Sequence, residues 1–316
     1  MKTSPTRVCV ILNPVAGRGK AKLAAQHLVN ELGKFPEVNF ELWESTSAGE
    51  PLVLARKALT SHFSMVIAVG GDGTVGEVVN GLLQSESPCA PVLGVMPAGT
   101  GNDFAIGAGM PATFRESAAS LSRAVLGSRT RFADVIEVRD ASGKTLFAVN
   151  SVGIGFDAAV ARAVKSTQLN KVLGRLSYAY CVYKCLSSFR TFPLELTTLG
   201  ASSPLRIASC WLVACTNTER LGGGIKINPG ASPFDGAYDV CVGHSVPAVK
   251  LALLLPLAFA GLHRHFAGVS FLRCASATFF FPAGTPLHID GDPIDLAPPI
   301  TLTAVTSRLR LLVPQG

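Results

Sequence analysis

The sequence is poor in charge and in long apolar runs, and both shortages exclude classes of protein. Charged residues make up 16% of the 316 residues, against about 25% in an average soluble protein. Hydrophobic residues reach 48% and the mean hydropathy is +0.38, which is enough for a sizeable core and excludes a disordered chain. Nevertheless, 28 Lys and Arg against 21 Asp and Glu leave a net charge of +7. The chain is therefore apolar and basic at once.

No apolar run is long enough to cross a bilayer. The most hydrophobic stretch, residues 251–262, contains Pro256 and is flanked by Lys250 and Arg264, whereas a span needs about 20 apolar residues. The first residues lead into a strand-like run without the apolar region of a signal peptide, so we expect a cytoplasmic protein. The stretch at 251–262 is expected to be a helix that either packs on the rest of the protein or touches a lipid surface.

Aromatic residues make up only 7%, and no block of five or more basic residues occurs. Both absences argue against a nucleic-acid partner. The eight cysteines form no C-x-x-C pair, which argues against a zinc site, and we expect them to be buried free thiols in a reducing compartment. His263 and His265 are expected to be exposed side chains at a helix end.

The first third of the chain alternates strand-like and helix-like segments. Short runs that are not broken by polar residues predict strands, and helical patterns lie between them, which indicates a parallel sheet covered on both faces. We therefore expect an α/β nucleotide-binding domain over residues 1–130. The predicted strands are residues 8–12, 38–43, 65–69 and 92–96, and the predicted helices are residues 21–32, 51–59 and 75–83.

After about residue 130, strand-like segments follow one another between Gly, Pro and Asp turns, which is typical of an antiparallel β domain. Residues 131–304 are predicted to form this domain, with residues 305–316 packing back on the first and a ligand cleft between the two. Helices are expected only at residues 173–189 and 248–262. The predicted strands are residues 132–138, 145–149, 194–199, 207–215, 238–242, 269–281, 287–290, 300–304 and 309–313.

A glycine-rich loop, Gly70-Gly71-Asp72-Gly73-Thr74, follows a predicted strand and precedes a helix. Glycines let the backbone approach a ligand, and the N–H groups at a helix start bind anions. An acid beside bound phosphate is repulsive unless a divalent cation lies between them, so Asp72 suggests Mg²⁺–nucleotide chemistry. The alternative is a plain turn in which Asp72 caps the helix.

Two further loops make nucleotide binding the better interpretation. Residues 13–20 follow the first predicted strand and residues 97–103 follow the fourth, and in a parallel sheet such loops meet at the carboxyl edge. The loop at 13–20 is not a P-loop, because Ala21 follows Gly19-Lys20 where Ser or Thr is required. Residues 153–158 have dinucleotide-type glycine spacing but lie in the β-rich part, without the βαβ unit that such a site needs.

Six phrases occur in the order NPVAGRGK, GGDGTVGEVVNGL, MPAGTGNDFA, VNSVGIGFDAAVA, LGGGIKINPGASPFDGAYDV and HIDGDPI. Together they resemble the diacylglycerol kinase catalytic family, and among its members the soluble bacterial lipid kinases, which are related to sphingosine and ceramide kinases. The resemblance runs from about residue 7 to the end. It implies a three-layer N-terminal domain similar to phosphofructokinase and NAD kinase, a C-terminal β-sandwich, and ATP in the cleft between them.

The resemblance also implies roles for residues of the glycine loops. Asn13 and Thr46 would contact the nucleotide, the loop at 70–76 and Thr100 would hold the phosphates, and Asp72 would face Mg²⁺. The nucleotide-binding residues expected in this way are Asn13, Thr46, Gly70, Gly71, Asp72, Gly73, Thr74, Gly99, Thr100 and Asn102.

A structural metal site is implied at the loop from Ser232 to Ala237. Asp235 would supply a side-chain oxygen, and the backbone carbonyls of Ser232 and Ala237 would complete the site. Oxygen ligands suit Mg²⁺, with Ca²⁺ as the alternative ion. A hairpin turn at Asp235-Gly236 is the plainer interpretation, and the two are compatible.

The general base of the family is the acid that ends an Asp-Gly-Glu triplet, and this chain has Asp290-Gly291-Asp292 instead. Aspartate is one methylene shorter than glutamate, and proton transfer needs hydrogen-bond reach of the acceptor hydroxyl. Asp292 would therefore act if the loop lies closer or a water molecule bridges the gap. Asp290 is the second candidate.

The resulting prediction is an ATP-dependent lipid kinase that transfers the γ-phosphoryl group to a lipid hydroxyl, at the surface of an anionic membrane that its net charge favours. The alternatives are a phosphotransferase of the NAD kinase type and a catalytically silent lipid- or nucleotide-binding protein. Assembly into a homodimer is left open. The sequence does not name the acceptor lipid, since lipid pockets are lined by interchangeable apolar side chains.

Overall fold

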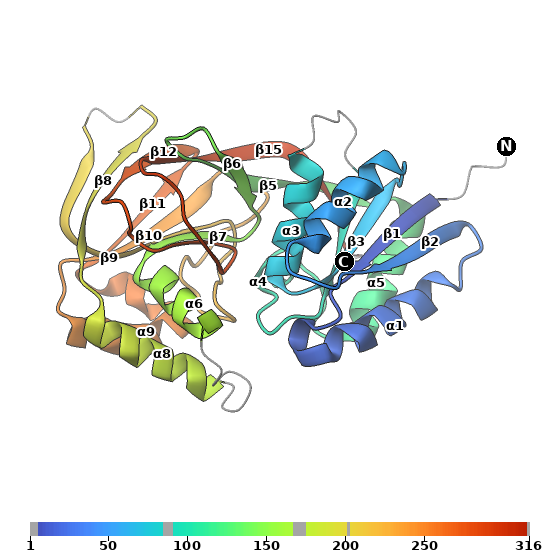
Figure 1. The fold of residues 1–316 in the computed structure, drawn as a ribbon, viewed down its shortest axis with the longest axis horizontal. Coiled ribbons are helices and arrows are strands. Elements are labelled where there is room, and N and C mark those ends of the chain that lie inside the picture. Colours follow the sequence, from blue (N-terminus) through green and yellow to red (C-terminus); the bar gives the residue numbers. More distant parts are fainter. Residues whose placement is uncertain (1–5, 85–90, 167–174, 201–202, 315–316) are drawn as a thin grey trace. The chain divides into compact units, whose positions relative to one another are not determined.

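The computed structural model describes residues 6–84, 91–166, 175–200 and 203–314. The chain forms two compact units (Figure 1). Unit 1 comprises residues up to Val135 together with those from Val305 onward, and unit 2 comprises Ile136–Ala304. Two strands, β5 (Thr130–Arg139) and β15 (Ile300–Leu312), contribute residues to both units.

Unit 1 is built on a parallel sheet, as the sequence predicts. Strand order is β4-β3-β1-β2, and every pair is parallel. Strands β3 and β4 are apolar and buried throughout, because helices cover both faces, whereas the edge strand β2 is largely exposed. The bounds are β1 Thr6–Leu12, α1 Lys20–Leu32, β2 Val38–Glu44, α2 Glu50–Thr60, β3 Met65–Gly70, α3 Asp72–Leu83, β4 Val92–Pro97, α4 Asp103–Gly107 and α5 Phe114–Gly127.

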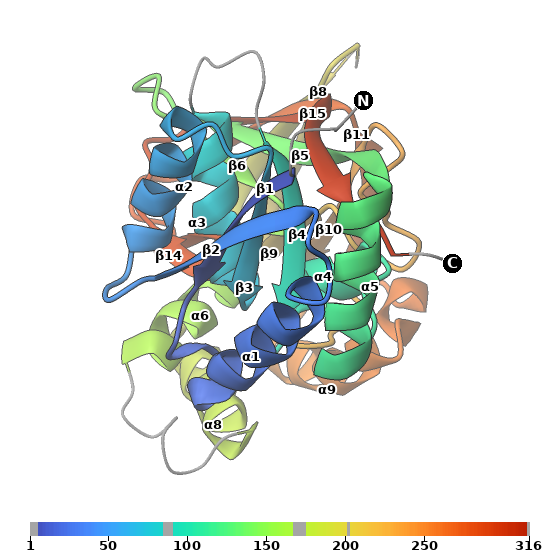
Figure 2. The ribbon, with the colours of Figure 1, turned by 90° about the vertical axis from the view of Figure 1, so that its right-hand side faces the viewer.

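The helices of unit 1 form the outer layers. Helix α1 packs on α5, and α2 packs on α3, so the sheet lies between two helical pairs (Figure 2). Helix α5, which the sequence analysis does not predict, begins with a capping box in which Thr113 and Glu116 bond to each other. The segment from Leu309 to Leu312 adds to this unit, because β15 pairs with β4 in parallel at Leu311 and Leu93.

Unit 2 is a mainly antiparallel, sandwich-like β structure. Its strands are β6 Thr145–Ala148, β7 Ser151–Gly155, β8 Phe192–Thr198, β9 Leu205–Thr216, β10 Tyr238–His244, β11 Val269–Cys274, β12 Ser276–Phe280, β13 Leu287–Ile289 and β14 Asp292–Ile294, with helices α6 Phe156–Ser166, α8 Arg175–Ser188 and α9 Ala248–Phe259. The one strand predicted at 269–281 is two strands separated at Ala275, and the two predicted at 300–313 are the single strand β15.

Two apolar clusters lie on opposite faces of β9. Cys210, Val213 and Cys215 belong to the core between the strands, whereas Trp211 and Ala214 belong to a cluster that also takes in side chains of α6, α8 and α9. The strand therefore buries both faces, which explains why it reads as a continuous apolar run.

Helix α6 corrects the expectation that unit 2 has two helices only. Gly155 at the end of β7 has φ +97°, and a Cβ there would lie 2.5 Å from the Phe192 ring and 2.6 Å from the Trp211 carbonyl oxygen. This glycine lets the chain turn directly from strand into helix. The glycine spacing at 153–158 thus marks a strand–helix junction within the β unit.

Seven described cysteines are free and buried, as predicted, and Cys89 lies outside the described residues. Burial raises the pKa of the Cys9 thiol to about 12. His263 corrects a prediction, because it is buried at 3% exposure and its Nε2 contacts the Ile227 carbonyl oxygen at 2.9 Å. Within the described residues, no helix combines the length and hydropathy needed to span a membrane.

Candidate active site

The loop between β3 and α3 is shaped for close backbone contact. Helix α3 begins at Asp72, directly after Gly70 and Gly71. A Cβ at Gly70 would lie 2.5 Å from Thr74, so a larger residue cannot be accommodated without a shift of this turn. The unpaired N–H groups at the start of α3 therefore face the carboxyl edge of the sheet without side chains in front of them.

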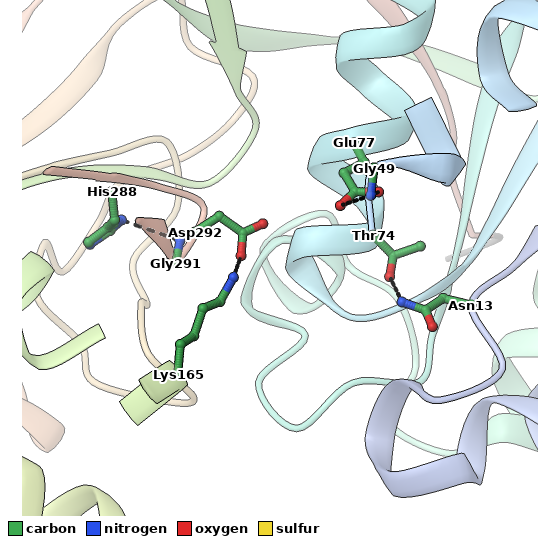
Figure 3. Close-up of polar contacts among 8 residues, drawn as sticks. All are labelled: Asn13, Gly49, Thr74, Glu77, Lys165, His288, Gly291 and Asp292. Carbon is green, nitrogen blue, oxygen red and sulfur yellow. Dashed lines mark hydrogen bonds and ion pairs between the residues drawn. The ribbon is translucent and has the colours of Figure 1, made fainter. Parts of the chain in front are cut away.

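The three glycine loops contact one another at this edge, which confirms that they converge. A Cβ at Gly99 would lie 2.4 Å from the Cα of Gly71, and one at Gly17 would lie 2.1 Å from the Ala98 carbonyl oxygen. Asn13 adds a side-chain link, because its Nδ2 donates to the Thr74 Oγ1 at 3.0 Å (Figure 3). The close approach at Gly17, Gly71 and Gly99 requires glycine, and it brings the three loops together at one edge of the sheet.

Asn102 shapes the loop after β4. Its Oδ1 accepts a hydrogen bond from the Gly99 N–H at 2.7 Å, and its Nδ2 donates to the Gly99 carbonyl oxygen at 3.1 Å. Its φ of 58° lies in the left-handed region, which asparagine tolerates. Asn102 therefore closes the turn that presents the exposed Thr100.

Asp72 is half-buried, and its carboxylate points at the start of α4. Its Oδ1 accepts a hydrogen bond from the Phe104 N–H at 3.1 Å. Burial raises the pKa of this carboxyl, and backbone N–H groups of Phe104, Asp103 and Asn102 oppose the rise. Carboxylate oxygens are the ligand type that Mg²⁺ takes, so the Asp72 side chain fits that ion.

The loop after β2, which holds Thr46, is braced by two glutamates. Thr46 donates its hydroxyl to Glu50 Oε2 at 2.8 Å, and the Gly49 N–H lies 3.2 Å from both carboxylate oxygens of Glu77 (Figure 3). The N–H of Thr46 lowers the pKa of Glu50. Glu77 was not predicted as a site residue, and its place in the phrase GGDGTVGEVVNGL is the only sequence feature that could have indicated it.

In unit 2, Asp290 and Gly291 form the turn of the β13–β14 hairpin. Their φ angles are 50° and 82°, as expected for an Asp-Gly turn. The Asp290 carboxylate is buried and accepts three backbone N–H bonds, from Val149 at 3.0 Å, Asn150 at 2.8 Å and Ser151 at 2.9 Å. Asp290 therefore anchors the turn to the chain before β7, and its role as a second base stays a prediction.

Asp292 is the more accessible of the two acids. Its side chain is 42% exposed and forms an ion pair with Lys165 of α6 (Figure 3). The cation orients the carboxylate, part of which remains exposed to solvent. The sequence analysis misses Lys165, because its contact with Asp292 joins residues 127 positions apart.

A buried histidine supports the same turn. Gly291 donates its N–H to His288 Nδ1 at 3.3 Å, and His288 Nε2 lies 3.2 Å from Asp157 Oδ2. This places the proton on Nε2 and leaves Nδ1 as the acceptor. A Cβ at Gly153 would come within 2.2 Å of both Asp157 and His288, so this glycine makes room for the pair.

The loop with the implied structural metal site holds a cation of its own. Arg273 Nη2 lies 2.9 Å from Asp235 Oδ2, and Asp235 Oδ1 accepts the Ala237 N–H at 3.3 Å. The described residues contain no group of three or more His, Cys, Asp or Glu side chains that could hold a metal. Arg273 therefore pairs with the one carboxylate of this loop, and the metal site implied from Ser232 to Ala237 stays a prediction.

Two family models match the chain. The diacylglycerol kinase catalytic domain matches residues 7–138, and the YegS C-terminal NAD kinase beta sandwich-like domain matches residues 150–313. Among curated proteins, a diacylglycerol kinase of Bacillus subtilis is 29% identical over 90% of this chain and 89% of its own length. A protein of Pseudomonas fluorescens named "Probable lipid kinase YegS-like" is 30% identical over 86% of this chain and 84% of its own.

The fold also matches a solved structure. A diacylglycerol kinase from Bacillus anthracis superposes with a TM-score of 0.72, at 22% identity, over 99% of this chain and 98% of its own. At this identity the likeness supports the architecture alone, with a parallel α/β unit followed by a β-rich unit.

Proposed function

This chain belongs to the diacylglycerol kinase family of lipid kinases, and from that premise we propose that it transfers the γ-phosphoryl group of ATP to a hydroxyl of a diacylglycerol-like lipid. The mutual contact of three glycine loops at one sheet edge carries this proposal. The N–H groups at the start of a helix are suited to a polyphosphate, and glycine loops beside them allow the close approach that phosphate binding needs.

Unit 1 is proposed to bind the nucleotide. The backbone N–H groups at the start of α3 would bind the phosphates, with the loops at 13–19 and 97–102, Thr46 and Asn13 beside them. Mg²⁺, when bound at Asp72, would neutralise charge on the phosphate oxygens. Asp72 must be ionised for this, and its contact with the Phe104 N–H keeps it oriented.

Unit 2 is proposed to supply the base. The lipid hydroxyl gives its proton to the Asp292 carboxylate as its oxygen forms a bond to the γ-phosphorus, and the bond from that phosphorus to the leaving ADP oxygen breaks. Transfer of this kind depends mainly on positioning and charge stabilisation. Asp290, His288 and Asp157 hold the turn that carries Asp292, which favours Asp292 over Asp290 as the base.

The enzyme is further proposed to be cytoplasmic and to work at the surface of an anionic membrane, where a diacylglycerol-like substrate resides. The net charge of +7 supports attraction to such a surface and to ATP.

The test is incubation with radiolabelled ATP, Mg²⁺ and a total lipid extract, followed by mass spectrometry of any labelled lipid. We expect label in a lipid with a free hydroxyl, and none with Asp72→Ala. A parallel reaction with NAD as acceptor tests the NAD kinase alternative. Binding of ATP with no labelled product from either acceptor would contradict the proposal and leave a catalytically silent protein.

A further inference from the structure

Helix α9 is apolar on both its buried and its exposed face, and Lys250 is its one charged residue. Leu251, Leu254 and Ala258 are buried in the unit-2 core, as expected for one face of a packed helix. The opposite face consists of Val249, Leu253, Pro256 and Ala260, spaced at four, three and four residues, and all four are exposed. Val249 is 73% exposed and Leu253 is 69% exposed. We call these four residues the α9 outer face.

Large apolar side chains extend the α9 outer face along the chain. Phe259 lies at the end of the helix, and Leu262 and Phe266 follow in and after the 3₁₀ turn at Leu262–His265; each is at least 41% exposed. Helix α8, which packs against α9 (Figure 1), adds Tyr183 at 72% exposure. Several large apolar side chains exposed on one helix and the turn after it mark an interaction site.

The two sequence segments that hold α8 and α9 carry charge of one sign. Residues 158–194 and 240–289, which include α8 and α9, hold nine of the 28 Lys and Arg and none of the 21 Asp and Glu. The remaining residues therefore carry 19 Lys and Arg against 21 acids, a net charge of −2. The whole positive balance of the chain lies in these two segments.

Two cations flank the α9 outer face directly. Lys250 lies beside Val249, and Arg264 lies in the 3₁₀ turn between Leu262 and Phe266. Within the described part of the chain, neither side chain forms an ion pair, in contrast with Lys165 and Arg273. Apolar side chains bordered by cations that form no ion pair are the composition of a helix that lies in the surface of an anionic bilayer.

We propose that the α9 outer face, with Leu262, Phe266, Lys250 and Arg264, docks the protein on an anionic phospholipid surface. This inference rests on the proposed function only in that a membrane is where a lipid kinase meets its substrate. The apolar side chains enter the interface between headgroups and acyl chains, and the two cations pair with lipid phosphates. Docking in this way needs no spanning helix.

The test is flotation of the full chain with vesicles of phosphatidylglycerol mixed with phosphatidylcholine. We expect the wild type to float with these vesicles and to bind pure phosphatidylcholine far less. Val249→Glu/Leu253→Glu should lower the partition coefficient at least about tenfold, since two apolar side chains leave the bilayer. Lys250→Ala/Arg264→Ala should lower it about tenfold or more on anionic vesicles, since each cation near such a surface contributes roughly 1 kcal/mol.

The matched control is Leu199→Glu, which places the same charge on an exposed leucine of unit 2 outside the α9 outer face. It should float like the wild type. Equal flotation of Val249→Glu/Leu253→Glu and the wild type would overturn the proposal. So would analytical ultracentrifugation showing a wild-type dimer that this variant dissociates, because the face would then bind a second copy.

A separate assay keeps this inference distinct from the kinase proposal. Phosphorylation of a short-chain diacylglycerol in detergent micelles does not need docking on a bilayer, so Val249→Glu/Leu253→Glu should retain it while losing activity on vesicles. If the wild type also fails to phosphorylate the micellar substrate, the kinase proposal is refuted, and the flotation result is unaffected.

Discussion

The two units build their parts of the candidate site in different ways. In unit 1, backbone meets backbone, with Gly71 against Gly99 and Gly17 against Ala98. In unit 2, side chains hold one short turn, with Asp290 on three N–H groups and His288 on Gly291. A backbone site is specified by the absence of side chains, whereas a side-chain site is specified by partners far away in the sequence. The two should therefore fail differently when mutated.

The largest effect is expected for Asp292→Asn in unit 2. The amide cannot accept the proton of the lipid hydroxyl, so kcat should fall by roughly 10²–10⁴-fold, the usual contribution of a general base. The measurement is the rate of labelled lipid formation at saturating ATP. Asp295→Asn is the control, because that acid is 95% exposed and pairs only with Arg162 among the described residues. Wild-type turnover in Asp292→Asn would disprove the base assignment.

The second largest effect is expected for Gly99→Ala in unit 1, which adds a single methyl group. In Gly99→Ala the added Cβ would lie 2.4 Å from the Gly71 Cα, so the two loops must separate. Displacement of about 1 Å costs on the order of 100-fold in rate, and we expect such a loss in kcat/KM for ATP. Gly127→Ala is the matched control, since its nearest neighbour is 3.4 Å away. Equal kinetics for both variants would show that the loop contact is dispensable.

Asp290→Asn should act on stability. The amide is neutral, so all three N–H groups lose their charged partner, and at least one of them faces an NH₂ group in place of an oxygen. We expect the free energy of unfolding to fall by about 1–3 kcal/mol, measured by urea denaturation. Asp295→Asn, on the exposed strand end, should leave it unchanged. An unaltered midpoint for Asp290→Asn would mean that the turn does not depend on this anchor.

The smallest effect is expected for Asp72→Asn, and it separates the role of Asp72 in activity from its effect on the stability of the protein. Burial raises its pKa in the folded state, so the ionised form is unfavourable there relative to the unfolded chain. Asp72→Asn should therefore be more stable than the wild type at neutral pH, although it is inactive. The difference should vanish as the pH falls through the raised pKa toward the ordinary value, where both states are protonated. A lower free energy of unfolding for Asp72→Asn than for the wild type at neutral pH would contradict this prediction.

The same contrast explains what could be predicted from the sequence. The order of strands and helices in unit 1 and the convergence of its glycine loops follow from local periodicity and from spacing after each strand. The roles of Asp290 and Asp292 depend on Val149–Ser151 and on Lys165, more than 120 positions away, and no local pattern contains such information. His263 was misjudged for this reason, because its burial depends on Ile227.

Helix α6 was missed because its first residues follow a strand without an intervening loop. Gly155 is the junction, and its positive φ replaces the turn residues that usually separate two elements. The sequence was sufficient to reject a dinucleotide motif at these glycines. Their structural roles are to leave space for the Asp157–His288 pair at Gly153 and to form the strand–helix turn at Gly155. These roles depend on residues distant in the sequence, such as His288, Phe192 and Trp211.

Strand β15 has a consequence for the folding of the protein during its synthesis on the ribosome. Leu309, Leu311 and Leu312 are buried in unit 1, and Leu311 pairs with Leu93 of β4. Synthesis must therefore pass through all of unit 2 before the edge of the unit-1 sheet is covered. Until β15 has been synthesised, the β4 edge of the unit-1 sheet lacks its strand partner and remains exposed.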